Sequence, residues 1–144
     1  ERIASSSLIK LFTTAGLDTR VIFTTSTPTS DPCERSGTSW LMEVSTSCGR
    51  LGGTSPFDIN KDEKFDTLDL VTVDNQQVSV SGLELKKQTG IVSEITWVEG
   101  DATKGIAYKL LPGSSGQVES IANSSDTGAT GGGPPKRIYW EQIQ

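Results

Sequence analysis

The sequence Arg20-Val21-Ile22-Phe23-Thr24-Thr25 decides the fold class, because four of its six residues are β-branched. Such residues fit the pleated, half-buried surface of a sheet. A second segment of this kind follows at residues 39–44, and the stretch between them, residues 27–38, contains prolines and a glycine that favour turns. We therefore predict two strands, over residues 20–25 and 39–44, joined by a turn-rich loop.

The rest of the chain continues the β pattern, and helical periodicity is almost missing. Asp74-Asn75 could join residues 70–73 to residues 77–80 as a hairpin, because these residue types suit tight turns. Residues 123–135 are rich in glycine and proline and predict a loop or linker. The fold class is therefore predicted to be mostly β, with further strands at residues 78–81, 91–98, 107–111, 117–121 and 137–140.

Composition excludes several classes of function. The chain has 144 residues, which is one domain's worth, and it carries a net charge of -5 with no histidine. Ser-His-Asp and Cys-His catalysis and imidazole metal sites are therefore excluded. The 13 basic residues are scattered, which argues against nucleic-acid binding. No apolar run approaches the roughly 20 residues of a membrane span, so no membrane insertion is expected.

The two cysteines, Cys33 and Cys48, are too few for a structural zinc site, which usually takes four Cys or His ligands. Either one disulfide or two independent thiols fits the sequence. The chain begins at Glu1 rather than at a methionine and shows no signal peptide, which predicts a processed or excised fragment.

The segment from Asp58 to Asp69 has the spacing of a calcium loop. Oxygen-bearing side chains stand at loop positions 1, 3, 5, 9 and 12, and position 7 would contribute its backbone carbonyl. Five carboxylates and two lysines leave the segment with a net charge of about -3, which repels itself without a cation. The predicted ligands of Ca²⁺ are Asp58, Asn60, Asp62, Lys64 (through its carbonyl), Asp66 and Asp69.

Two positions depart from the usual calcium loop. Glu63 stands at position 6, where glycine normally makes a sharp turn, so the turn is predicted to form at some backbone cost. Asp69 at position 12 is shorter than the usual bidentate glutamate. Both changes predict weak binding, with a dissociation constant of roughly 10⁻⁴ to 10⁻³ M. One helical turn near Asp66 is expected, but not a full helix-loop-helix, and a solvated acidic turn is the alternative interpretation.

Other motifs carry weaker signals. Asp126-Thr127-Gly128 matches the short motif of aspartic proteases, but a single copy would need a homodimer, and the polar residues around it favour a flexible loop. No enzyme activity is therefore predicted. Trp40, Trp97 and Trp140 could form a platform that stacks on carbohydrate, although strand tryptophans more often pack inside the protein.

Seven segments, taken in order, resemble the C-terminal part of the PilC/PilY family, the large proteins of type IV pilus tips and pilus biogenesis. Together they cover nearly the whole chain from about Arg20 onward. The segments are residues 20–25, Asp31-Pro32-Cys33, residues 37–43, residues 54–62, Val80-Ser81-Gly82, residues 89–93 and residues 137–143.

The resemblance implies a fragment of a quinoprotein-like β-propeller, its last blade or two, with a C-terminal tail and an inserted calcium loop. Propeller-blade strands would occupy residues 1–50, the calcium loop and a β segment residues 51–122, and a Gly/Pro-rich loop with a terminal strand residues 123–144. A closed propeller needs at least four blades, so upstream blades or partner chains would complete it.

The resemblance also implies a function in pilus assembly, retraction control and adhesion. Partners would be minor pilins or pilus tip proteins and a host-surface receptor. The protein would pass through the periplasm to the cell surface or pilus tip. A calcium-stabilised structural or carbohydrate-binding module of another secreted surface protein is the alternative function.

Overall fold

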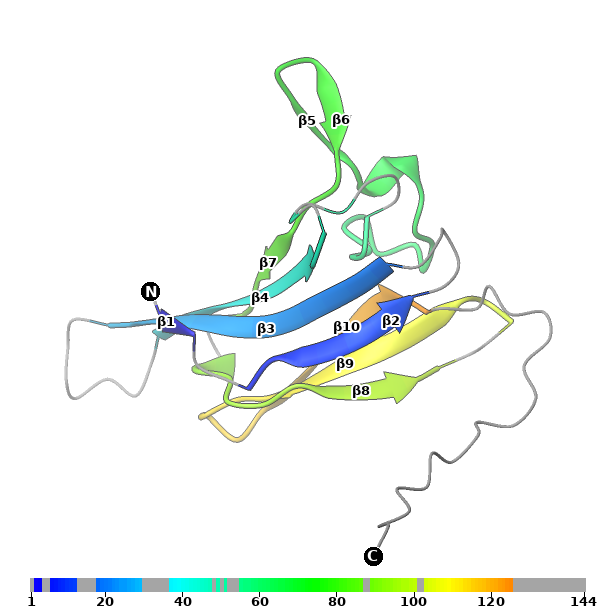
Figure 1. The fold of residues 1–144 in the computed structure, drawn as a ribbon. Coiled ribbons are helices and arrows are strands. Elements are labelled where there is room, and N and C mark those ends of the chain that lie inside the picture. The colour runs from blue at the N-terminus through cyan, green and yellow to red at the C-terminus, as the bar shows by residue number, and fades with distance from the viewer. Residues whose placement is uncertain are drawn as a thin grey trace, which may run out of the picture.

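A computed structural model describes residues 2–3, 6–12, 18–29, 37–47, 49, 51, 55–86, 89–100 and 103–125. The chain is mostly β, as predicted (Figure 1). The strands are β1 (Arg2–Ile3), β2 (Leu8–Phe12), β3 (Asp18–Pro28), β4 (Gly37–Ser45), β5 (Val71–Val73), β6 (Gln76–Val78), β7 (Gly82–Glu84), β8 (Thr96–Glu99), β9 (Ile106–Pro112) and β10 (Val118–Ser124), and a 3-10 helix, η1, spans Thr67–Asp69.

The larger sheet is built around the two strands that the sequence predicted most clearly. β3 pairs antiparallel with β4 over nine residue pairs, from Arg20 with Ser45 to Pro28 with Gly37. β1 and β2 both pair with the other edge of β3, and β7 pairs with β4. The other strands of this sheet are therefore all attached to the long β3–β4 pair.

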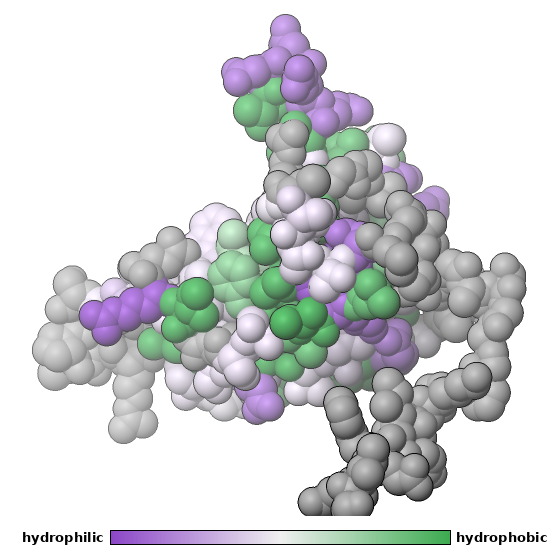
Figure 2. Space-filling view, in the orientation of Figure 1, coloured by the Kyte–Doolittle hydropathy of each residue, from purple (hydrophilic) through white to green (hydrophobic). Residues whose placement is uncertain are grey.

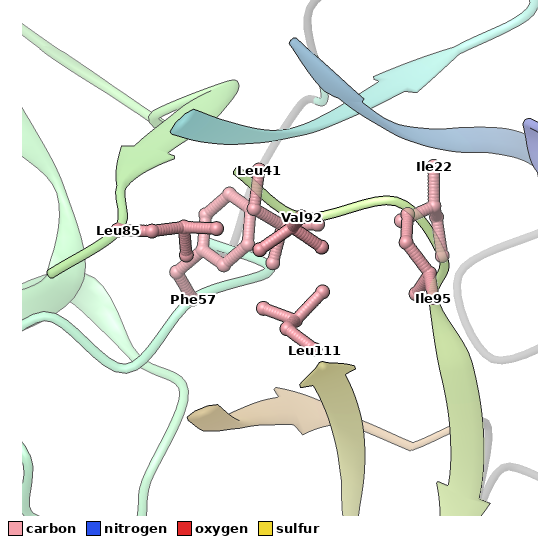
Figure 3. Packing of buried hydrophobic residues seen from close by; sticks show 7 residues of the cluster. All are labelled: Ile22, Leu41, Phe57, Leu85, Val92, Ile95 and Leu111. Atoms are coloured by element: carbon pink, nitrogen blue, oxygen red, sulfur yellow. The ribbon is translucent and has the colours of Figure 1, made fainter. Parts of the chain in front are cut away.

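The smaller sheet has the order β10-β9-β8 and lies against the larger one (Figure 1). Ile22 and Leu41 from the larger sheet meet Leu111 from β9 in one apolar cluster (Figure 3). Phe57, Leu85, Val92 and Ile95 complete the cluster from the connecting segments. Described residues from both of the predicted segments, 1–50 and 51–122, therefore contribute to one apolar cluster.

The strand predicted over residues 91–98 is wrong in its first part. Only β8, Thr96–Glu99, is a strand there, and Ile91–Ile95 is not. Side chains of the larger sheet form hydrogen bonds with the backbone of this segment. Thr24 Oγ1 donates to the carbonyl of Val92 at 3.2 Å, and the Val92 N–H donates to Ser39 Oγ at 3.3 Å. Val92 makes only an isolated bridge, to Gly113. Hydroxyl groups thus make the hydrogen bonds with Val92 that a neighbouring strand would have made if this segment were a strand.

The predicted hairpin at Asp74-Asn75 is confirmed. β5 pairs with β6, and Asp74 and Asn75 have φ values of 49° and 62°, as a two-residue turn with both central residues left-handed requires. The hairpin stands away from the two sheets, and its tip is hydrophilic (Figures 1 and 2). β6 ends at Val78, so the strand predicted over residues 78–81 does not form.

β9 and β10 confirm two further predicted strands. β10 continues to Ser124, so Asn123 belongs to a strand and not to the predicted loop. The remainder of that loop and the predicted strand at residues 137–140 lie outside the described residues. Within the part of the chain that is described, no helix is long and apolar enough to cross a membrane.

Candidate functional site

The acidic loop, residues 58–69, leaves the core directly after a buried anchor. Phe57 is fully buried and bridges to Asn123 on β10, and its N–H donates to Ser55 Oγ at 3.2 Å. The loop then runs along the outside of the body and returns through η1 toward β5 (Figure 1). Both ends of the loop are therefore held by the folded domain.

Asp58 organises the first half of the loop by accepting three backbone hydrogen bonds. Its Oδ1 accepts from the N–H groups of Lys61 at 2.6 Å and Asp62 at 3.2 Å, and its Oδ2 accepts from that of Glu63 at 2.9 Å. The Asp62 N–H is shared with Asn60 Oδ1, at 3.0 Å. These bonds wrap the backbone around the Asp58 carboxylate.

Asp69 closes the second half of the loop. Its side chain is fully buried, and its Oδ1 accepts from the N–H groups of Ile59 at 2.7 Å and Asn60 at 3.4 Å. Its Oδ2 accepts from the Asp66 N–H at 3.2 Å, while Asp66 Oδ1 accepts from the Leu68 N–H at 2.7 Å, which makes a capping box around η1. The single helical turn predicted near Asp66 is present.

The backbone turns sharply at position 6 without glycine. Glu63 has a φ of 62° and Lys61 a φ of 64°, both in the left-handed region that side chains with a Cβ disfavour. The cost predicted for a glutamate at this position is therefore visible in the backbone. Lys104 Nζ lies 3.4 Å from Glu63 Oε2, but both side chains are exposed and the pair contributes little.

Replacing Glu63 with glycine tests this backbone cost. We expect Glu63→Gly to raise the free energy of unfolding by up to about 1 kcal/mol, because the left-handed strain exceeds the entropy that glycine loses on folding. Urea denaturation in chelator measures the change. Glu63→Gln is the control, since it removes the charge and keeps the strain; an equal gain in both variants would attribute the effect to charge.

The loop brings some of the predicted ligands together and leaves others apart. Asp58 and Asn60 share one N–H group, and Asp69 reaches back to the start of the loop. Asp62 Oδ1 accepts from the Lys64 N–H at 2.9 Å, so it faces the backbone. Among the described residues, no three acidic, histidine or cysteine side chains gather closely enough to ligate one ion.

The donor chemistry of the loop nevertheless fits calcium. All six positions offer oxygen atoms, and most of the side chains are held by backbone N–H groups within one short turn. A hard divalent cation prefers carboxylate, amide and carbonyl oxygens of this kind. The oxygens that now accept N–H groups are the same atoms that would serve as ligands.

The other motifs of the sequence are placed only in part. Asp126-Thr127-Gly128, Cys33, Cys48 and Trp140 lie outside the described residues. Trp40 is on β4, in the larger sheet, whereas Trp97 is on β8 in the smaller one. The Trp97 ring packs edge-on against Phe12, and Lys10 Nζ lies 3.7 Å from its centroid. Side chains of the protein itself thus contact the Trp97 ring on which a sugar would have to stack.

Sequence reasoning missed a buried polar network between the two sheets. Lys109 on β9 and Glu43 on β4 are both fully buried and form an ion pair. Glu43 Oε1 also accepts from Arg20 Nη1 at 2.9 Å, and Arg20 in turn contacts Asp18. Lys109 Nζ donates to Asn123 Oδ1 at 2.8 Å.

One signal could have revealed this network. Glu43 lies two residues from buried Leu41, and Lys109 two residues from buried Ala107 and Leu111, so the period of the strands turns both charges inward. Burial lowers the pKa of Lys109 below its ordinary value of 10.5, and the charge of Glu43 opposes that shift.

Comparison with protein families, with curated proteins and with solved structures gives no match for this chain.

Proposed function

We propose that this chain is a calcium-binding module of a PilC/PilY-like protein that acts in type IV pilus assembly, retraction control and surface adhesion. The observation that carries the proposal is the loop of residues 58–69, in which oxygen-bearing residues at calcium-loop spacing are wrapped into a compact turn. The role is structural and adhesive, with no catalytic step.

Calcium would be held by side-chain oxygens of Asp58, Asn60, Asp62, Asp66 and Asp69 and by the carbonyl of Lys64. The ion supplies positive charge to a segment with a net charge of about -3, and it removes the repulsion within that segment. Since Phe57 and Asp69 are fully buried at the two ends, ordering the loop stabilises the domain that holds it.

The propeller interpretation draws on the larger sheet. β2, β3, β4 and β7 lie side by side as antiparallel strands, and four such strands make one propeller blade. Hydrophobic side chains gather on the face of the molecule where β2 and β3 lie (Figure 2). Ile9 is 66% exposed and Leu11 52% exposed on β2, which suits contact with a neighbouring blade.

The pilus assignment draws on the resemblance of the seven ordered segments to the PilC/PilY family. It places the module on an exported protein that reaches the cell surface or pilus tip. Its partners would be minor pilins or tip proteins and a host-surface receptor. Calcium would tune these contacts by ordering the loop.

Calcium titration by calorimetry, with melting curves in calcium and in chelator, tests the proposal. We expect one saturable site with a dissociation constant of roughly 10⁻⁴ to 10⁻³ M. At one hundred times that concentration, calcium should stabilise the fold by about 2.7 kcal/mol. The Asp58→Ala, Asp62→Ala double variant should lose this gain.

The calcium-dependent gain is the informative quantity, because Asp58 accepts three N–H groups and its loss also lowers stability in chelator. The matched control removes two exposed carboxylates elsewhere, Glu84→Gln with Glu94→Gln, and keeps the calcium response. A flat titration of the unaltered chain, or an equal loss in the control, would contradict a site in this loop.

A further inference from the structure

Lys109, Asn123 and Glu43 form a sealed cluster in the middle of the molecule. All three are 0% exposed. Lys109 and Asn123 lie on the adjacent strands β9 and β10, and Glu43 faces them from β4 in the other sheet. The calcium proposal uses none of these residues.

The contacts of the cluster place an amine against an amide carbonyl. Lys109 Nζ donates to Asn123 Oδ1 at 2.8 Å and also to Glu43 Oε2. A carbonyl bond is about 1.23 Å long, so Nζ lies within about 4 Å of the amide carbon of Asn123. Reacting atoms in a near-attack arrangement are about 3 to 3.5 Å apart, which a small rotation of the lysine side chain would reach.

Two neighbouring contacts fix the orientation of the reacting groups. Asn123 Nδ2 donates to the carbonyl of Ser124 at 3.1 Å, which turns the amide oxygen toward Lys109. Arg20 Nη1 donates to Glu43 Oε1 at 2.9 Å, which leaves the other carboxylate oxygen for Lys109. Both ends of the amine–amide contact are therefore held in place.

The surroundings favour a reactive amine. Attack needs the neutral form of the lysine, and burial lowers the pKa of Lys109. The Phe57 ring centroid lies 4.6 Å from Lys109 Nζ, and that of Trp97 lies 5.9 Å away. The Lys109 side chain beside these rings is 0% exposed, so the amine does not face bulk solvent.

We propose that Lys109 and Asn123 join through an intramolecular isopeptide bond, with Glu43 as the proton carrier. The bond would clamp β9 to β10 covalently beneath the larger sheet. This inference rests on the contacts of the cluster and does not depend on calcium binding.

The reaction balances without an oxidant or any co-reactant. Glu43 accepts a proton from the Lys109 ammonium, and the neutral Nζ attacks Cγ of Asn123. The new Nζ–Cγ bond forms, and the Cγ–Nδ2 bond breaks. Of the three protons on Nζ, one remains in the new amide and two leave with the departing NH₂ group, by way of Glu43, as ammonium.

Mass spectrometry of the reduced, denatured chain tests the bond directly. We expect the mass to be lower than the sequence mass by one ammonia. A protease that cuts after glutamate separates Lys109 from Asn123 at Glu119, so the peptides of residues 100–119 and 120–141 should remain covalently joined. Trypsin should also fail to cut after Lys109.

The full sequence mass in the unaltered chain would overturn the proposal. So would a loss of ammonia with the two peptides separate, because an asparagine that cyclises onto its own backbone gives that result. These measurements need no variant and stand even if every substitution in the cluster prevents folding.

Variants assign the roles of the three residues. Lys109→Met and Asn123→Ala should restore the full mass expected for each sequence, since each lacks one partner of the bond. Glu43→Gln keeps both partners and should also stay unlinked, because its amide cannot carry the proton. Lys104→Met, which removes an exposed lysine on the same side of Glu119, should keep the joined peptides. A joined pair in Lys109→Met would overturn the assignment.

Discussion

Glu43→Gln is expected to lower the free energy of unfolding by about 3–5 kcal/mol, because it leaves the fully buried Lys109 without its carboxylate, while the partly buried Arg20 keeps its pair with Asp18. Glu43 is fully buried and pairs with both Arg20 and Lys109. The substitution keeps the shape of the side chain and removes its charge, and under the proposal above it also leaves Lys109 and Asn123 unlinked. Urea denaturation followed by circular dichroism measures the loss.

The same substitution at Glu99 is the matched control. Glu99 also pairs with one lysine, Lys10, but its side chain is 66% exposed. Exposed pairs contribute about 0–1 kcal/mol, so Glu99→Gln should change the free energy of unfolding by no more than that. If both variants lost the same free energy of unfolding, burial would not be what makes the Glu43 ion pairs stabilising.

A double variant separates the charge effect from loss of the cross-link. Glu43→Gln combined with Lys109→Met lacks the isopeptide bond, as Glu43→Gln alone does, but contains no unpaired buried ammonium. It should therefore be more stable than the single Glu43→Gln variant, because the two substitutions act on one pair and are not additive. A double variant that is less stable would assign the loss to packing.

The sequence predicted those parts of the fold that depend on neighbours along the chain. β3 and β4 follow from β-branched and alternating residues, and the hairpin between β5 and β6 follows from the turn at Asp74-Asn75. The sharp turn predicted at position 6 of the acidic loop is also local, although the hydrogen bonds to Asp58 from N–H groups three to five residues ahead were not themselves predicted. Short-range geometry of this kind can be predicted from spacing alone.

The features that the sequence did not predict depend on contacts across the fold. The β-branched residues in Ile91–Ile95 suggested a strand, but hydroxyl groups of Thr24 and Ser39, more than fifty residues away, hydrogen-bond to the backbone of Val92. Lys109 and Glu43 are 66 residues apart, so nothing in either local segment indicates that they meet. The alternation of residues along each strand indicates that both side chains point inward, but it does not indicate that they pair with each other.

Phe57→Ala is expected to lower the free energy of unfolding by about 3–5 kcal/mol, the usual loss when a large aromatic side chain is removed from a core. Phe57 is fully buried and packs with residues of both sheets (Figure 3). Leu68→Ala, at a side chain that is 70% exposed on the acidic loop, should change stability by about 0.5 kcal/mol or less. Urea denaturation in chelator compares the two.

Phe57→Ala should also weaken calcium binding, although Phe57 offers no ligand. Its backbone bridges to Asn123 and places Asp58, the first residue of the acidic loop, against the body. Without the buried ring, the start of the loop is less restrained, and calcium must order more of the chain on binding. Calorimetric titration below the unfolding transition should therefore give a larger dissociation constant in Phe57→Ala than in Leu68→Ala. An unchanged constant would mean that the hydrogen bonds of Asp58 and Asp69 hold the loop without the core.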